Sequence, residues 1–381
     1  MIYLDNAATS LHKPEGVVLA AADAICRLGN AGRGVHEATL AAARVVFDAR
    51  DKLATLFHVG DPTRVCMMFN ATDALNTAIG GLICPGDHVV TTAQEHNSVL
   101  RPLYRAQQQG AQLTIVPMDR KTGRVSEADI LAAIRPDTRA VVCAHASNVT
   151  GNVLDIETIG TFCREHGILF IVDAAQTAGT FPIDMQQMGI SVLCAPGHKG
   201  LLAPQGTGVL CAAEGVEITP MRVGGSGVHS FSHTHPTDYP TALEAGTLNT
   251  PGIAGLSAAL DFIQRKGVET IHAEEIALAR QFYKQISLLD GVTIYGDWST
   301  DHRAAIVTLN LEGWDAGELS DVLMQEYDIC TRAGAHCAPL VHKTFGTQAG
   351  GAVRFSFSCF NTEDEALAAA RAVAELAQEG D

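Results

Sequence analysis

Short runs of β-branched residues alternate with longer helical patterns between residues 60 and 215, and this alternation constrains the fold more than any other feature. Strands separated by helical segments of about ten to fifteen residues form βαβ units, whose strands lie parallel in one sheet. The strand candidates are Arg64–Phe69, His88–Thr92, Gln112–Val116, Ala140–His145, Ile168–Asp173, Ser191–Ala195 and Thr207–Ala212. Apolar runs such as ILFIV are typical of strands covered on both faces. We therefore expect a largely parallel α/β sheet.

The pattern changes after residue 215. The stretch from Gly224 to Pro240 is rich in Gly, Ser, His, Thr and Pro and lacks periodicity, which predicts a long loop. After Pro251 come helices, a strand at Ala304–Leu311, another helix, a strand at Ala352–Ser358 and a closing helix. This order predicts a separate, smaller α/β unit.

Charge and cysteine content narrow the partners and the compartment. Lys and Arg number 26 against 42 Asp and Glu, and the net charge of −16 repels a phosphate backbone, so nucleic acid is not an expected partner. No apolar run approaches the roughly 18 residues of a membrane helix, and no signal-peptide pattern opens the chain. The ten cysteines include no CxxC pair and lie mostly in apolar stretches. We expect reduced thiols in a cytoplasmic protein that has no membrane partner.

Polar residues follow the predicted strands at the edge where parallel sheets bind ligands. Ala71, Thr72 and Asp73 open a helix, whose N–H groups and Thr72 hydroxyl form an anion site, with a plain helix cap as the alternative. His96 follows the second strand, where a structural, hydrogen-bonded histidine is the alternative. Asn148 lies in the segment HASNVTG. These positions predict a ligand-binding edge of the sheet.

Two further strand ends carry ionisable side chains. Asp173 ends the apolar run ILFIVD and needs a partner to stay ionised, and Gln176 follows it. Lys199 lies in a Gly- and Pro-rich turn, where a lysine in apolar surroundings can lose its proton and form a Schiff base with an aldehyde. A nucleoside-triphosphate site is not indicated, because the string GxxxxGK[ST] is absent.

Together these residues match what pyridoxal 5'-phosphate requires. Asp173 would keep the ring nitrogen protonated, His96 would stack on the ring, Thr72 would hold the phosphate and Lys199 would carry the Schiff base. A metal site is the competing interpretation of His229, His233 and His235, which are spaced H-x3-H-x-H. Because these histidines lie in the predicted loop, we expect no metal but a solvated or substrate-gating loop.

The motifs YLDNAAT, GRGVH, NATDALN, EHNS, SNVTG, VDAAQ, GHK, EAGTLNTPG, RAGAHCA and RFSFSCFNTEDE follow one another along the chain. This order resembles the class V aminotransferase family and, within it, group II cysteine desulfurases and selenocysteine lyases, over essentially the whole chain. The resemblance implies the PLP-dependent transferase fold type I: a mainly parallel seven-stranded sheet with helices on both faces, plus a smaller α/β C-terminal domain. It implies a large PLP-binding domain at residues 15–250, and a small domain of residues 1–14 and 251–381 that carries a catalytic cysteine loop.

The same resemblance implies roles for individual residues. Lys199 would form the Schiff base, Asp173 and Gln176 would contact the ring, His96 would stack on it, and Asn148 would lie near the substrate carboxylate. The cofactor-binding set is Ala71, Thr72, Asp73, His96, Asn148, Asp173, Gln176, His198, Lys199 and Thr247, with His198 on the phosphate and Thr247 reaching the phosphate of the neighbouring subunit of a homodimer.

Four residues are implied around the substrate by the same resemblance. Arg354 would clamp the α-carboxylate, a bidentate task suited to guanidinium. Arg332 corresponds to the arginine just before the catalytic-loop cysteine. Arg33 and His36 of GRGVH would border the cleft.

Within the resembled family, Cys337 distinguishes a cysteine desulfurase from the other activities. It lies among small residues in TRAGAHCAPL, five residues after Arg332 and next to His336, and cationic neighbours lower a thiol pKa. Its thiolate would attack the sulfur of L-cysteine, leaving a Cys337 persulfide and L-alanine, and a sulfur-acceptor protein would be a further partner. An inert thiol, as expected for the other nine cysteines, is the alternative.

Other activities of the same scaffold stay open. They are a selenocysteine lyase acting on L-selenocysteine, another class V enzyme such as an aminotransferase, racemase or C–S lyase, and a sulfur carrier without catalysis. Two positions depart from the resembled pattern. Pro196 stands where relatives usually have a Ser or Thr that donates to the phosphate, and Ala335 stands where Suf-type relatives often have a second His.

Overall fold

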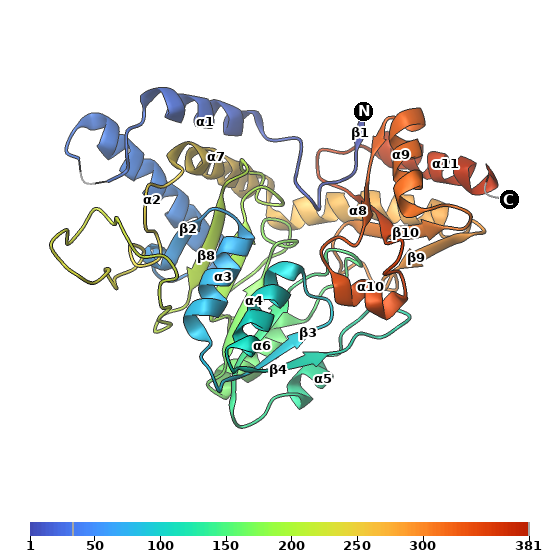
Figure 1. Ribbon diagram of the computed structural model, residues 1–381. Coiled ribbons are helices and arrows are strands. Elements are labelled where there is room, and N and C mark those ends of the chain that lie inside the picture. The colour runs from blue at the N-terminus through green and yellow to red at the C-terminus, as the bar shows by residue number, and fades with distance from the viewer. Residues whose placement is uncertain (33, 380–381) are drawn as a thin grey trace.

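Seven strands form one sheet in the order β2-β8-β7-β6-β5-β3-β4 in the computed structural model, which describes residues 1–32 and 34–379 (Figure 1). From β7 to β4 every pair is parallel, and β8 is antiparallel to both of its neighbours. All seven predicted strands and the mainly parallel sheet are confirmed. The strands are β2 (Val65–Met68), β3 (His88–Thr92), β4 (Gln112–Val116), β5 (Thr138–Ala144), β6 (Leu169–Asp173), β7 (Val192–Pro196) and β8 (Gly208–Ala212).

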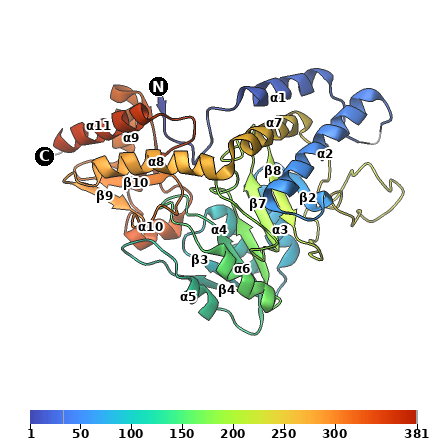
Figure 2. The same cartoon turned by 180° about the vertical axis from the view of Figure 1, so that it is seen from behind.

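Helices cover both faces of this sheet (Figures 1 and 2). Alternate side chains of β5 pack on opposite faces: Val141 and Cys143 join the cluster under α2, α6 and α7, whereas Ala140 and Val142 join the cluster under α3 and α4. Burial on both faces explains the continuous apolar runs in the sequence. The helices are α1 (Glu15–Arg27), α2 (Glu37–Phe57), α3 (Ala71–Leu82), α4 (Asn97–Gln108), α5 (Glu127–Ala132), α6 (Ile156–Glu165) and α7 (Thr250–Lys266), with a 3-10 turn, η1, at Pro62–Arg64.

The last third of the chain forms a second, smaller α/β unit around its own core. Its antiparallel sheet has the order β12-β13-β10-β9, and the short strand β1 (Ile2–Tyr3) pairs in parallel with β11 (Ile329–Cys330). The N-terminus therefore lies beside the C-terminal unit (Figure 1). The other elements are α8 (Val268–Ile286), β9 (Val292–Tyr295), β10 (Ile306–Leu311), α9 (Ala316–Tyr327), β12 (Arg332–Gly334), α10 (Pro339–Phe345), β13 (Ala352–Ser356) and α11 (Glu363–Glu379).

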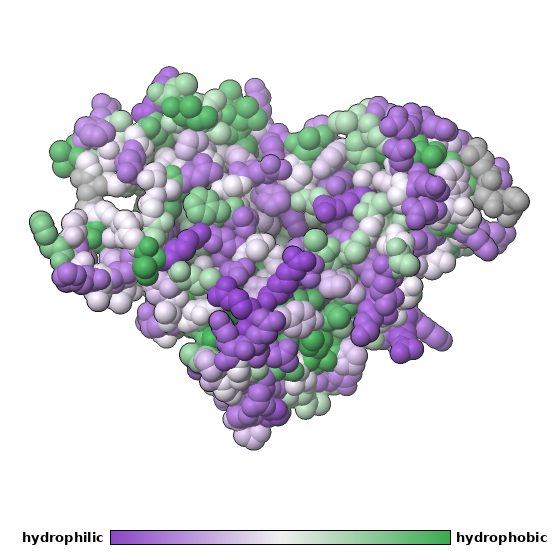
Figure 3. Space-filling model, in the orientation of Figure 1, coloured by the Kyte–Doolittle hydropathy of each residue, from purple (hydrophilic) through white to green (hydrophobic). Residues whose placement is uncertain are grey.

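Residues 213–249, all of which the structure describes, form neither helix nor strand, and this confirms the predicted loop. Large apolar side chains are exposed here and on the neighbouring helices α1 and α2, and Figure 3 shows apolar surface over α1. They include Val18, Leu19, Ile25, Phe47 and Phe231. Within residues 1–32 and 34–379, no helix is both long and apolar enough to cross a membrane.

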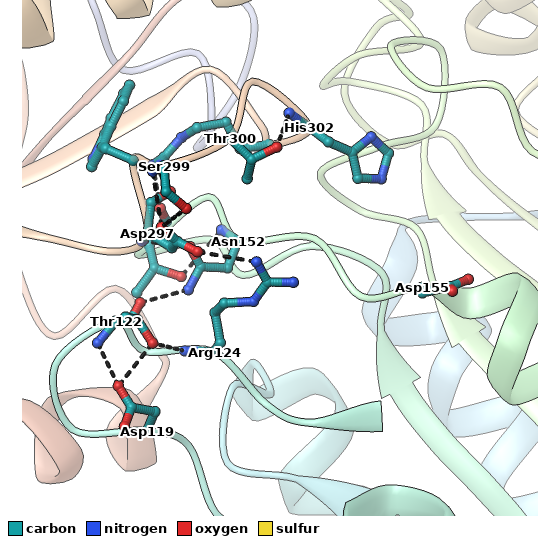
Figure 4. A network of polar contacts seen from close by, with 12 residues as sticks. Asp119, Thr122, Arg124, Asn152, Asp155, Asp297, Ser299, Thr300 and His302 are labelled. Atoms are coloured by element: carbon teal, nitrogen blue, oxygen red, sulfur yellow. Dashed lines mark hydrogen bonds and ion pairs between the residues drawn. The ribbon is translucent and has the colours of Figure 1, made fainter. Parts of the chain in front are cut away.

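A polar network joins the two units close to the segment that follows β5 (Figure 4). Asn152 donates to the carbonyl of Thr122 at 2.8 Å and accepts from the N–H of Asp297 at 2.9 Å. Arg124 pairs with the Asp297 carboxylate at 3.0 Å. One neutral hydrogen bond and one ion pair, both to Asp297, therefore connect the segments around Asn152 and Arg124 to the small unit.

Candidate active site

A cavity of about 200 Å³ lies where β5, β6 and β7 end, between the large sheet and the smaller unit. Both units contribute to its wall, which is the arrangement expected at the carboxyl edge of a parallel sheet. The predicted site residues that line it are Ala71, Thr72, His96, Asn148, Asp173, Gln176, His198, Lys199, Arg332, Cys337 and Arg354.

The start of α3 forms one end of the cavity. Asn70 caps the helix by accepting from the N–H of Asp73 at 2.9 Å. The N–H groups of Ala71 and Thr72 belong to the first turn of the helix, where backbone N–H groups have no intrahelical acceptor. Gly208 of β8 lies so close to Asn70 that a Cβ would approach its backbone to 2.7 Å. Only glycine therefore fits this position, and the close approach holds the helix start in place.

His96 caps α4 and is held in one protonation state. Its Nδ1 accepts from the N–H of Ser98 at 3.0 Å, so the ring proton lies on Nε2. The Ser98 hydroxyl contacts both His96 Nδ1 (2.9 Å) and Thr72 Oγ1 (2.7 Å). Burial, together with the charge of Lys199, lowers the pKa of His96 to about 4. The imidazole is thus neutral at physiological pH.

Asp173 and Lys199 face the same cavity. Burial raises the pKa of Asp173, while the N–H of Ala175, 2.9 Å from Oδ1, and the charge of Lys199 act in the opposite direction. Burial and the positive charge of Arg354 lower the pKa of Lys199 to about 8. The lysine can therefore supply a neutral amine near neutral pH, which a Schiff base needs.

Gln176 and His198 are fixed by the N-terminal segment. Gln176 Nε2 donates to the carbonyl of Ala7 at 3.2 Å, and His198 Nδ1 lies 3.0 Å from Thr9 Oγ1. Burial and the charge of Lys199 lower the pKa of His198 to about 4. A phosphate here would meet a neutral His198, which can donate a hydrogen bond without adding charge.

Arg354 reaches the cavity from β13 with a buried guanidinium. It donates to the carbonyl of Asn148 at 3.0 Å and pairs with Asp5 at 2.9 Å. Among the described residues its Nε has no hydrogen-bond partner, and neither has Oδ1 of Asn148. Because unsatisfied buried polar atoms are costly, these two atoms indicate that a polar ligand belongs here.

Cys337 lies exposed in the cavity wall, in a loop with unusual backbone geometry. His336 and Cys337 both adopt positive φ, at 49° and 56°. The carbonyl of Cys337 accepts from the N–H of Asn97 at 2.7 Å, and that of His336 accepts from Asn148 Nδ2 at 2.8 Å. The large unit therefore holds the cysteine loop from two sides.

The prediction that His336 is a cationic neighbour of Cys337 is wrong. Its ring is buried and contacts Arg332 and His342, and burial with the charge of Arg354 lowers its pKa to about 3. A neutral imidazole cannot stabilise a thiolate by charge. The Lys and Arg side chains that line the cavity together with the cysteine are Lys199, Arg332 and Arg354.

Other cysteines are also accessible, so exposure alone does not single out Cys337. All ten cysteines, each in the described part of the chain, are free thiols; five are buried, and Cys26 and Cys84 are exposed. Burial raises the pKa of the buried thiols, for example that of Cys163 to about 12. What distinguishes Cys337 is its place in the cavity wall.

Some predicted residues lie elsewhere. The N–H of Asp73 is taken by Asn70 and its carboxylate pairs with Arg222 at 2.8 Å, so Asp73 is not available to an anion. In the described part of this single chain, neither His36, which caps α2, nor the exposed Thr247 lines the cavity. Arg33 lies outside the described residues.

Sequence reasoning missed three contributors. Ser98 and Asn70 lie inside the motifs EHNS and NATDALN. Asn and Ser are common at the starts of helices, and this preference could have indicated them. Asp5 lies in YLDNAAT, and no local pattern indicated that it would meet Arg354.

The side chains fit pyridoxal phosphate. Helix N–H groups and the Thr72 hydroxyl suit a phosphate, Asp173 suits a pyridinium nitrogen, and Lys199 suits an aldehyde. A metal is not favoured by the geometry, since no three His, Cys, Asp or Glu side chains within residues 1–32 and 34–379 converge on one point. His235 instead bonds to the backbone of Gly224 and Ala242.

Comparison with known proteins gives consistent matches. The family model "Aminotransferase class-V" matches residues 2–368. The chain is 33% identical to a probable cysteine desulfurase from Methanothermobacter thermautotrophicus, over 100% of this chain and 95% of that one. A probable cysteine desulfurase from Halobacterium salinarum is 37% identical over 99% and 92%. The apo structure of a cysteine desulfurase from Thermococcus onnurineus NA1 superposes with a TM-score of 0.93 at 30% identity, covering 99% and 95%.

Proposed function

Because this chain belongs to the aminotransferase class-V family, we propose that it is a pyridoxal-phosphate-dependent cysteine desulfurase. The reaction converts L-cysteine and the Cys337 thiol into L-alanine and a Cys337 persulfide. One C–S bond breaks, one S–S bond forms, and the hydrogen of the thiol balances the new C–H bond, so no external oxidant is needed.

One observation carries the proposal: Lys199 and Cys337, from different units, line the same cavity. A lysine that binds an aldehyde is expected in any enzyme of this family. A thiol facing that lysine is required only when sulfur is taken from the substrate. The names of the full-length relatives agree with this conclusion.

The cofactor would be held by residues of the large unit. Ala71, Thr72 and His198 would bind its phosphate, Asp173 would face its ring nitrogen, and Lys199 would bind its aldehyde. When bound, the cofactor supplies an electron-accepting ring that activates the substrate carbon next to the amine.

The remaining residues act on the substrate. Arg354, whose Nε has no partner among the described residues, would donate to the substrate carboxylate. Oδ1 of Asn148 only accepts, so it would take a hydrogen bond from a donor of the ligand. Lys199, whose pKa is about 8, can accept a proton and return it. Arg332 would lie beside the substrate, in the wall of the cavity that also contains Cys337. Since Cys337 is exposed, a sulfur-acceptor protein could collect the persulfide from outside.

We further propose a homodimer, formed through α1, α2 and the loop of residues 213–249. Val18, Ile25, Phe47 and Phe231 are exposed there, and contiguous apolar surface is usually covered by a partner. Thr247, in the same region, would complete the phosphate site of the second subunit. Light scattering should give twice the chain mass.

The test is to incubate the holoenzyme with L-cysteine or L-selenocysteine and quantify alanine with sulfide or selenide. Lys199→Ala should abolish the cofactor absorbance band and both activities. Cys337→Ala should abolish sulfur release from L-cysteine, whereas Cys84→Ala, which removes an exposed thiol outside the cavity, should not. Activity on L-selenocysteine alone would identify a selenocysteine lyase, and full desulfurase activity of Cys337→Ala would exclude the persulfide mechanism.

A further inference from the structure

A short series of side-chain hydrogen bonds connects the cysteine loop with His342 of α10 and with Thr347, which follows that helix. Thr347 Oγ1 is 2.8 Å from His342 Nδ1. His342 Nε2 is 3.4 Å from His336 Nδ1, and the planes of the two rings differ by 21°. His336 Nε2 is 2.9 Å from the carbonyl of Arg332. None of the roles proposed above uses Thr347 or His342.

The positions of the hydrogens in this series of hydrogen bonds follow from the bond between His336 Nε2 and the carbonyl of Arg332. A carbonyl only accepts, so His336 Nε2 carries the proton and Nδ1 of the neutral ring is an acceptor. His342 Nε2 must then donate to His336, which leaves His342 Nδ1 as the acceptor for the Thr347 hydroxyl. Every donor and acceptor along the chain therefore points the same way, from Thr347 to Arg332.

Burial keeps both rings in the neutral form that this assignment needs. Each imidazole is buried, and burial is the main reason why both pKa values are lowered, that of His336 to about 3. A protonated ring would place two donors against each other at the His336–His342 contact.

The loop held by these hydrogen bonds has a backbone conformation that is costly for L-residues. His336 and Cys337 are consecutive residues with positive φ and side chains beyond Cβ, a conformation that L-residues adopt at a cost in energy. Asn97 and Asn148 of the large unit hold the two loop carbonyls. Through His342, the His336 ring is connected by side chains to Thr347 of the small unit.

We propose that Thr347 and His342 are positioning residues, which act through His336 to hold Cys337 against the cavity. The inference rests on the proposed function, because the position of Cys337 is measured through the rate at which it takes sulfur from the substrate. Without the Thr347 hydroxyl, His342 can move its proton to Nδ1, His336 then loses its donor, and the loop loses one of its supports.

The experiment compares Thr347→Val, which keeps the shape but removes the hydroxyl, with Thr347→Ser, which keeps the hydroxyl. Thr347 is half-buried and lies just after the C-cap of α10, so both variants should fold. For Thr347→Val we expect kcat with L-cysteine to fall about fivefold, the size of one neutral hydrogen bond, with KM unchanged. Thr347→Ser should restore kcat.

A second readout does not depend on catalysis. Hydrogen exchange of peptides covering residues 334–347 should be faster in Thr347→Val than in the wild-type protein and unchanged in Thr347→Ser. Equal exchange and equal kcat in all three proteins would overturn the inference. A wild-type protein that releases no sulfide would refute the proposed function instead, while the exchange comparison would still decide whether the hydrogen-bond chain holds the loop.

Discussion

Arg354 and Asp5 form a buried ion pair at 2.9 Å that ties the N-terminal segment to β13. Their side chains are 2% and 19% exposed, and the backbone of the same segment pairs with Ser356 of β13. The arginine expected to bind the substrate carboxylate thus already has a carboxylate partner. Asp5 orients the guanidinium fork before the substrate arrives, and it offsets part of the cost of burying that charge.

Asp5→Asn should therefore weaken both folding and substrate binding. We expect the free energy of unfolding to fall by about 1–3 kcal/mol, because the buried guanidinium loses its counter-charge. KM for L-cysteine should rise, with a smaller effect on kcat. Urea unfolding and steady-state kinetics measure these effects.

The control is Asp137→Asn, which breaks the exposed Arg135–Asp137 pair. An exposed ion pair contributes at most about 1 kcal/mol, so this variant should stay close to wild type. A lower KM in Asp5→Asn would show instead that Asp5 competes with the substrate carboxylate.

Lys199 should react as an amine with a pKa near 8, far below the ordinary lysine value of about 10.5. Labelling of the apoenzyme with acetic anhydride, followed by mass spectrometry of the Lys199 peptide, should rise with pH and reach half of its maximum near pH 8. Asp173→Asn removes a negative charge that favours the protonated amine, so the midpoint should move to lower pH. A midpoint near 10, with or without Asp173, would contradict the burial of this lysine.

The strands and the residues at their ends could be predicted because both depend on local sequence. Apolar runs such as that before Asp173 mark buried strands, and parallel topology brings their ends to one edge. The cavity therefore contains most of the residues expected there. Helices α1 and α2 were not predicted, although Ala42, Val46, Ala49 and Leu53 have the spacing of a buried helical face.

The errors concern contacts between distant segments. His336 is neutral because its ring is buried beside His342. The pairing of Arg354 with Asp5, which lies at the other end of the chain, was not predicted. The Asp73 carboxylate is taken by Arg222 from a loop without regular structure. Neighbours in sequence do not reveal such partners.

Glu95, next to His96, should make stability depend on pH. Its carboxyl accepts from the Thr92 hydroxyl and from the N–H of Ala144, and burial, with Asp173 nearby, raises its pKa to about 8. The folded protein keeps a proton that the unfolded chain loses above about pH 4.5. Stability from this group is therefore present below that pH and decreases as the pH rises towards 8.

Glu95→Gln lacks this titration and can still make two hydrogen bonds: its amide oxygen accepts from the N–H of Ala144, and its amide nitrogen donates to the Thr92 hydroxyl. The decrease in unfolding free energy between pH 6 and pH 9 should be smaller in this variant than in the wild type, by at least about 1 kcal/mol. Glu312→Gln, at an exposed position, should follow the wild type. Parallel curves for all three proteins would mean that Glu95 titrates normally.

Pro196 gives a prediction of improved cofactor binding. It ends β7 opposite Gly208, lines the cavity beside the start of α3, and offers no hydrogen-bond donor. Pro196→Ser would add a hydroxyl three residues before Lys199. A hydrogen bond to a charged group contributes about 1.5 kcal/mol, so the Kd for pyridoxal phosphate should fall by about tenfold. Absorbance titration of the apoenzyme with pyridoxal phosphate measures this Kd.

The control is Pro196→Ala, which makes the same backbone change without the hydroxyl and should not gain affinity. Equal Kd values for both variants would show that the hydroxyl does not reach the phosphate.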